Sequence, residues 1–171
     1  MANQAIREAI DHVVKVIVAN PEKARVSNAT AIASLKNDLS FSVCGPNGEI
    51  VSTDMPRGIG GGGGVPQPGW LLRAALASCT GTVIAMRAAK IGIDLEKLDV
   101  TVASHSDNRG MLGLDEGVSA AMIGLRTVVH IRAANASRDQ LVSLARWADA
   151  HSPVACTLRS MLAAEIEVVS D

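Results

Sequence analysis

The chain has 171 residues, of which 48% are hydrophobic, and its formal net charge at pH 7 is −1. This length suits one domain with a substantial core, and the apolar content excludes a disordered chain. The balanced charge and the scarcity of aromatic residues (Phe41, Trp70 and Trp147) exclude the basic, base-stacking surface of a nucleic-acid-binding protein.

The compartment expected from the sequence is the cytoplasm. The first sixteen residues carry Glu8 and Asp11 where a secretory signal needs an unbroken apolar run. No stretch of eighteen apolar residues is evident, so we expect no membrane span. Three widely spaced cysteines, an odd number, argue against the disulfide framework of a secreted domain.

The first half of the chain predicts a helix, three strands and a second, longer helix. Apolar residues recur at helical spacing over residues 4–19, and Asn20-Pro21 ends that helix. Residues 29–51 predict two strands and the start of a third, with breaks at 36–38 and 45–48. A glycine-rich loop at residues 58–68 leads into a helix from about Gly69 to Lys90, with Gly92 as its C-terminal glycine.

The second half predicts two strands, a pair of helices and a closing strand. Alternating residues around Val100 and over residues 123–131 predict strands, joined by a loop at 107–119. Ser137 and Gln140 form a capping box that starts a helix ending near His151. Ser152-Pro153 starts another helix, and residues 163–169 predict a last strand. The fold class expected is therefore α+β.

The run of five glycines at residues 60–64 is open to two interpretations. A phosphate-binding loop opens directly into a helix and, in the P-loop case, is followed by Lys and Ser or Thr. Here residues 65–68 (Val-Pro-Gln-Pro) intervene and no lysine follows. A flexible lid or crossing loop is therefore favoured over nucleotide binding.

The candidate reactive groups are cysteines. Cys79 lies in the middle of the long apolar helix, and Cys156 lies in the first turns of the last helix. Both have a plain alternative, because free cysteine often only packs in a core. His151 could pair with Cys156 as a base, but a histidine at a helix junction is commonly a cap or surface residue. No Cys/His spacing matches a zinc site, and we expect no metal or cofactor.

Two segments resemble the OsmC/Ohr family of osmotically inducible and organic hydroperoxide resistance proteins. The first runs from Val51 to Ile93, where Pro68–Leu72 and Ala75–Cys79 fit the family's Pro-x-x-Leu-Leu and Ala-x-x-x-Cys pattern. The second is the ADAHSPVACTL segment around Ser152-Pro153. The resemblance covers about residues 25–170. It predicts an OsmC-like domain at residues 23–171, preceded by an added amphipathic helix at residues 1–22.

This resemblance implies two central helices packed against antiparallel sheets and completed by an intertwined homodimer. It also implies two reactive thiols, activated by an Arg and a Glu. Cys79 matches the thiol that attacks peroxide. Ser152 stands where the family has its second cysteine, so Cys156, one turn later, is the candidate resolving thiol. Gly69 stands where the family has its Glu, and Arg25 and Lys36 are the nearest cations to the family's Arg.

The function that this resemblance implies is thiol-dependent reduction of organic hydroperoxides through Cys79 and Cys156. The implied partners are a small apolar hydroperoxide, an external dithiol reductant and a second copy of the chain. Two alternatives remain open at this point. One is a non-catalytic protein of the same fold that binds a small apolar ligand, and the other is a structural stress protein.

Overall fold

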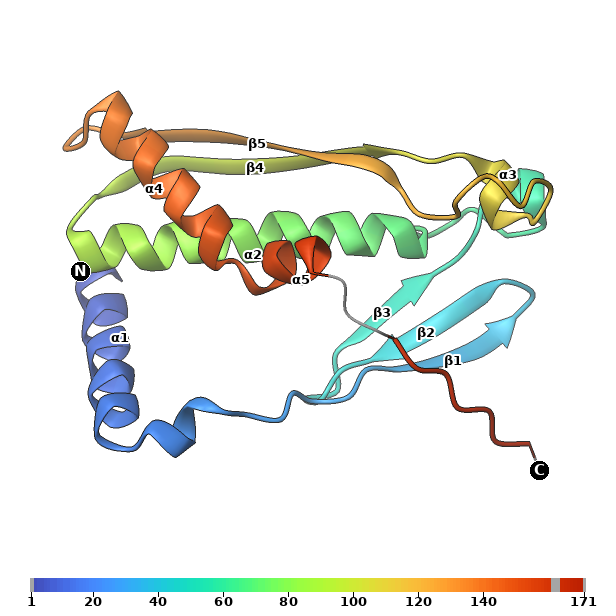
Figure 1. The fold of residues 1–171 in the computed structure, drawn as a ribbon, viewed down its shortest axis with the longest axis horizontal. Helices are drawn as coiled ribbons and strands as arrows, with labels where there is room; N and C mark the ends of the chain where they lie inside the picture. Colours follow the sequence, from blue (N-terminus) through green and yellow to red (C-terminus); the bar gives the residue numbers. More distant parts are fainter. Residues whose placement is uncertain (1, 161–163, 171) are drawn as a thin grey trace. The chain divides into compact units, whose positions relative to one another are not determined.

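The computed structural model describes residues 2–160 and 164–170 (Figure 1). It divides into two compact units, one formed by residues 8–74 and the other by residues 1–7 together with 75–171. The α+β class predicted from the sequence is confirmed, with helices and antiparallel sheets along the chain. The predicted boundary between residues 22 and 23 stays a prediction.

The unit of residues 8–74 is built around an antiparallel sheet in the order β1-β2-β3. The strands are β1 (Ile32–Asn37), β2 (Ser40–Cys44) and β3 (Ile50–Thr53). They are preceded by α1 (Ala2–Ala19) and the short 3-10 helix η1 (Pro21–Ala24). The two predicted strand breaks are confirmed as tight turns between β1 and β2 and between β2 and β3.

The glycine-rich loop in this unit is held by one buried carboxylate. Asp54 accepts hydrogen bonds from the backbone N–H of Gly62 (2.8 Å) and of Met55 (2.7 Å). A Cβ at Gly61 would overlap the Met55 carbonyl, so the close approach of the two backbone segments requires glycine there. The loop includes the 3-10 helix η2 (Arg57–Ile59) and ends where α2 (Pro68–Ile91) begins.

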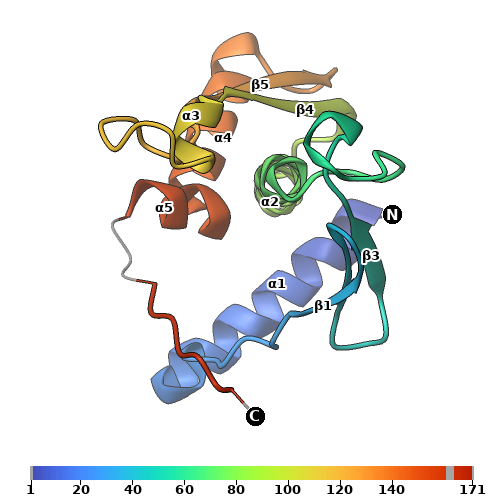
Figure 2. The same cartoon turned by 90° about the vertical axis from the view of Figure 1, so that its right-hand side faces the viewer.

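The unit that contains residues 75–171 packs helices on a long hairpin. Strands β4 (Leu95–His105) and β5 (Ile123–Ala133) pair antiparallel, with Val100 opposite Val129. The hairpin runs along α2, and α4 (Arg138–His151) runs from the end of the hairpin across α2 (Figure 1). In Figure 2, where α2 is seen end-on, the hairpin lies on one side of it. A one-turn helix, α3 (Asn108–Met111), interrupts the loop predicted at 107–119.

The core of this unit lies between α2, the hairpin and α4. Its buried residues are Ile84, Ala88, Ile93, Ala133, Leu144 and Ala148. Small alanines on α2 and α4 allow close packing there. Gly92, with φ of 78°, ends α2 in the left-handed conformation, as predicted. The capping box at Ser137 and Gln140 is also confirmed, and Ser152 is confirmed as the N-cap of α5 (Pro153–Arg159).

Two sequence expectations need correction. The predicted strand at residues 163–169 is wrong over 164–169, which have no regular secondary structure, while Ala163 lies outside the described residues. The apolar side chains of that segment, such as Ile166, are exposed. Among the described residues no strand pairs with it, and an alternating pattern forms a strand only when it packs against neighbours.

The second correction concerns α2. By length and composition alone, this 24-residue helix is apolar enough to cross a membrane, contrary to the sequence expectation. The long uncharged run between Arg73 and Arg87 produces this result. A mostly buried core helix passes the same test, but in α2 only 17% of the apolar window is buried, with Ile84 and Ala88 in the core of its unit.

Candidate functional site

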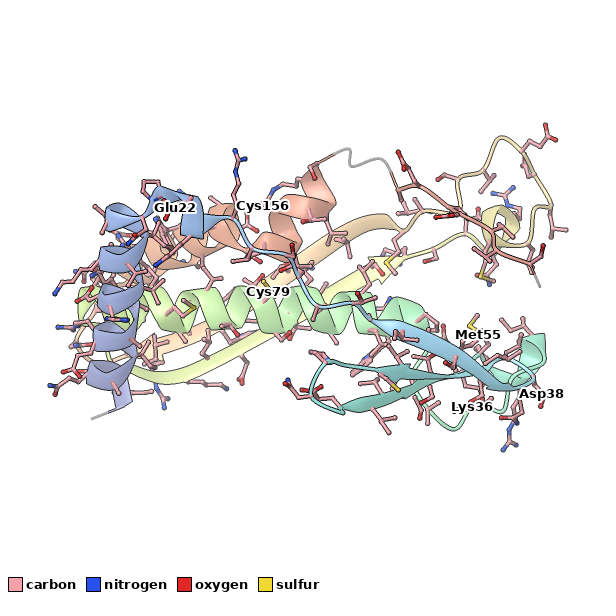
Figure 3. All side chains as sticks on the ribbon, turned by 90° about the horizontal axis from the view of Figure 1, so that it is seen from below. Glu22, Lys36, Asp38, Met55, Cys79 and Cys156 are labelled. Carbon is pink, nitrogen blue, oxygen red and sulfur yellow. The ribbon has the colours of Figure 1, made fainter. Side chains whose placement is uncertain are left out.

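Cys79 lies in the middle of α2, between buried Leu76 and Ile84, and its side chain is half-buried. The next residue, Thr80, is buried. Figure 3 shows Cys79 on α2 and Cys156 on α5. All three cysteines of the chain are free thiols.

Ser152 is the side chain that contacts the Cys79 sulfur. It is fully buried, and its hydroxyl donates a hydrogen bond to Cys79 Sγ at 3.2 Å. The same oxygen accepts the backbone N–H of Ala155 at 3.4 Å, because Ser152 is the N-cap of α5. Pro153 fits the first helical position, where the missing N–H is not needed. The start of α5 thus places a hydroxyl donor directly against the thiol.

Cys156 is exposed, and its sulfur has different neighbours. Its S–H donates to the backbone oxygen of Ala150 at 3.2 Å, and Arg159 Nη2 lies 3.7 Å from the sulfur. Arg159 also forms an ion pair with Asp149 at 3.0 Å. Asp149 first, and Cys156 second, hold the pKa of the Arg159 guanidinium above its usual value. The resolving role of Cys156 stays a prediction.

His151, considered as a base for Cys156, is engaged elsewhere. Its Nδ1 lies 2.7 Å from the backbone oxygen of Trp147, and its ring stacks on the Trp147 indole with centroids 4.0 Å apart. The Arg87 guanidinium carbon lies over the Trp147 ring, 4.6 Å from its centroid. This arrangement matches the plain interpretation of His151 as a residue of the helix junction.

The remaining candidates belong to the other unit. Arg25 follows η1, and Lys36 lies on β1 near its turn (Figure 3). Cys44 is exposed at the end of β2. Within residues 2–160 and 164–170, no three His, Cys, Asp or Glu side chains gather in a way that could hold a metal ion.

Sequence reasoning identified Ser152 as a cap but missed its contact with Cys79. Capping is a local property, whereas this contact joins residues 73 positions apart. One signal could have found it, since Ser152 stands where the family has its second cysteine. Sequence reasoning also missed Thr80, whose hydroxyl is buried without a hydrogen-bond partner among the described residues.

Replacing Thr80 with valine is expected to raise the free energy of unfolding by about 1 kcal/mol, because a buried hydroxyl without a partner becomes a methyl group of similar shape. In a chain of this length the melting temperature would rise by about 2–4 °C. Thermal unfolding followed by circular dichroism measures the change. Thr157→Val, an exposed helical position, serves as the control. A fall in melting temperature for Thr80→Val alone would show that the hydroxyl has a partner in solution.

The sequence model of the OsmC-like protein family matches residues 60–167, which is more than half of the chain. The protein therefore belongs to the OsmC-like family. The match includes Cys79, Ser152 and Cys156. No curated protein sequence matches this chain.

Solved structures show the same fold. An OsmC-like protein from Mycoplasma pneumoniae aligns over 80% of this chain and 91% of its own, with a TM-score of 0.68 and 16% identity. An organic hydroperoxide resistance protein OsmC from Legionella pneumophila covers 79% of this chain and 91% of its own (TM-score 0.59, 20% identity). One from Elizabethkingia anophelis covers 80% and 91% (TM-score 0.58, 17% identity). At identities this low, the structural similarity shows a shared fold and nothing further.

Proposed function

We propose that the protein is a thiol-dependent peroxidase that reduces organic hydroperoxides through Cys79. The observation that carries the proposal is the half-buried Cys79 sulfur, which accepts a hydrogen bond from the Ser152 hydroxyl at 3.2 Å. Peroxide reduction needs a nucleophilic sulfur with a nearby donor for the developing charge. Family membership supports the same assignment.

The reaction begins with attack of the Cys79 thiolate on the terminal oxygen of the hydroperoxide. An S–O bond forms and the O–O bond breaks, so the sulfur is oxidised and the leaving alkoxide takes a proton to become an alcohol. Cys79 is left as a sulfenic acid. The Cys156 thiol then condenses with it, releasing water and forming a disulfide. An external dithiol reduces that disulfide and returns both thiols.

The experiment compares single Cys→Ser variants at each of the three cysteines. Cys79→Ser is expected to lower hydroperoxide consumption at least a hundredfold with dithiothreitol as reductant, because the nucleophile is lost. Cys44→Ser is the matched control and should retain wild-type turnover, since Cys44 lies exposed at the end of β2. Cumene hydroperoxide is a suitable bulky substrate. Equal turnover in the Cys79 and Cys44 variants would refute the proposal.

The Cys156→Ser variant separates the two steps. If Cys156 resolves Cys79, one equivalent of hydroperoxide should leave a sulfenic acid on Cys79 in this variant, detectable by dimedone labelling and mass mapping. The wild type should instead give an intramolecular disulfide between Cys79 and Cys156. An oxidised wild type without that bond would remove Cys156 from the mechanism and leave a peroxidase that uses one cysteine.

We also propose that the protein acts as a cytoplasmic homodimer. The helix that carries the thiol leaves large apolar side chains exposed, among them Trp70, Met86 and Ile91. A second copy would cover such a surface. Sedimentation velocity is expected to give one species at twice the chain mass of 17.7 kDa. The species should not change on dilution to about 1 μM, because a stable dimer has a dissociation constant below that concentration. A monomer at that concentration would contradict the assembly but not the chemistry at Cys79.

A further inference from the structure

The Ser152 hydroxyl is a buried donor whose proton points at the Cys79 sulfur. Ser152 is 0% exposed, so its O–H has no contact with solvent. Its oxygen accepts the Ala155 N–H at 3.4 Å, which occupies a lone pair and leaves the proton free. Among the described residues, Cys79 Sγ at 3.2 Å is the only acceptor for that proton. Buried polar groups are normally hydrogen-bonded, so the sulfur receives the bond.

The direction of this bond favours the anionic form of the sulfur. A thiol sulfur is a weak acceptor, whereas a bond to a charged acceptor is about twice as strong as a neutral one. The hydroxyl therefore stabilises a thiolate more than a thiol, and the thiolate is the nucleophile. Over the described part of the chain, this neutral hydroxyl is the only side chain that donates to Cys79.

The start of α5 fixes the position of the hydroxyl. Ser152 has an extended backbone, with φ of −75° and ψ of 116°, which is the conformation that a following proline favours. Its side chain caps Ala155, and its carbonyl accepts the Cys156 N–H at 2.8 Å. The donor is thus in place before any reaction, and a group fixed in advance stabilises charge without reorganising.

We propose that Ser152 is a catalytic residue that holds the Cys79 sulfur in its nucleophilic form. This role rests on the peroxidase activity proposed above and adds a second group to that site. The hydroxyl keeps its own proton throughout, so the S–O bond forms and the O–O bond breaks at Cys79, and the alkoxide takes its proton from water.

The test compares Ser152→Gly with Ser152→Ala. Both variants remove the donor, but glycine is tolerated at an N-cap nearly as well as serine, whereas alanine is not. The first measurement is alkylation of Cys79 by iodoacetamide at pH 7, followed by mass mapping, with the exposed Cys44 as the reference thiol in the same sample. The second is consumption of cumene hydroperoxide with dithiothreitol.

Both variants are expected to slow alkylation and turnover at Cys79 by about three- to tenfold. One bond to a charged group changes the proportion of anionic sulfur by about ten- to a hundredfold. About half of that effect, on a logarithmic scale, is offset because a less basic thiolate is a weaker nucleophile. A role confined to capping would instead slow Ser152→Ala and leave Ser152→Gly at the wild-type rate.

The matched controls are Ser137→Gly and Ser137→Ala. Ser137 caps α4 through the same kind of bond, from its hydroxyl oxygen to the N–H of Gln140 at 3.3 Å. These variants make the same chemical changes at a cap that does not contact Cys79. Both should alkylate Cys79 and consume hydroperoxide at the wild-type rate.

Two results would overturn the role of Ser152. One is alkylation of Cys79 in Ser152→Gly at the wild-type rate or faster. The other is an equal slowing in the Ser137 variants. Neither depends on peroxidase activity, because alkylation needs no hydroperoxide. A wild type that consumes no hydroperoxide, yet loses alkylation rate in Ser152→Gly, would refute the peroxidase and retain Ser152 as the group that activates the thiol.

Discussion

Ser152→Cys in a Cys156→Ser background is expected to close a disulfide with Cys79 after one equivalent of hydroperoxide. The Ser152 oxygen lies 3.2 Å from Cys79 Sγ, and a sulfur in that place is larger and reaches further. A disulfide needs the two sulfurs about 2.05 Å apart, so only a small adjustment remains. The family pattern also has a cysteine at this position, directly before the proline of the helix.

Mass mapping after oxidation measures this result. The bridged peptide pair should account for nearly all of Cys79 in the double variant, whereas Cys156→Ser alone should retain a labelled sulfenic acid. With dithiothreitol, the bridged variant should also turn over without progressing to the irreversible sulfinic acid. If Cys79 and the introduced thiol both remained free after oxidation, the 3.2 Å contact would not persist in solution.

Ile84→Ala is expected to lower the free energy of unfolding by about 3 kcal/mol. Ile84 is 0% exposed and lies in the core between α2, the hairpin and α4. Removing its side chain leaves a cavity as well as losing the transfer free energy of burial, and such changes cost about 2–5 kcal/mol. That is a large fraction of the stability of a typical domain.

Urea denaturation followed by fluorescence of the two tryptophans measures this loss. Ile84→Val is the graded control, with an expected cost of about 0.5–1.5 kcal/mol. A smaller loss for Ile84→Ala than for Ile84→Val would mean that Ile84 does not belong to the core.

Local patterns in the sequence determined most of the secondary structure. The helical periodicity of residues 4–19, the capping box at Ser137 and the glycine at position 92 depend on neighbours within a few residues, and each is confirmed. The same holds for the turns between β1, β2 and β3. The family was also accessible from sequence, because the pattern around Cys79 is contiguous.

Strand pairing and long-range contacts were decided only by the tertiary structure. Alternating residues at 163–169 predicted a strand, yet a strand needs an adjacent edge, and residues 164–169 have none. The Ser152 contact with Cys79 joins α5 to α2. A cavity of about 670 Å³ in this unit is lined by side chains of α2, β5, α4 and α5. Periodicity assigns a residue to a helix face or a strand face, but which faces meet is set by packing of the whole unit. The sequence alone therefore determined most of the elements and the family, and the folded unit decided what surrounds Cys79.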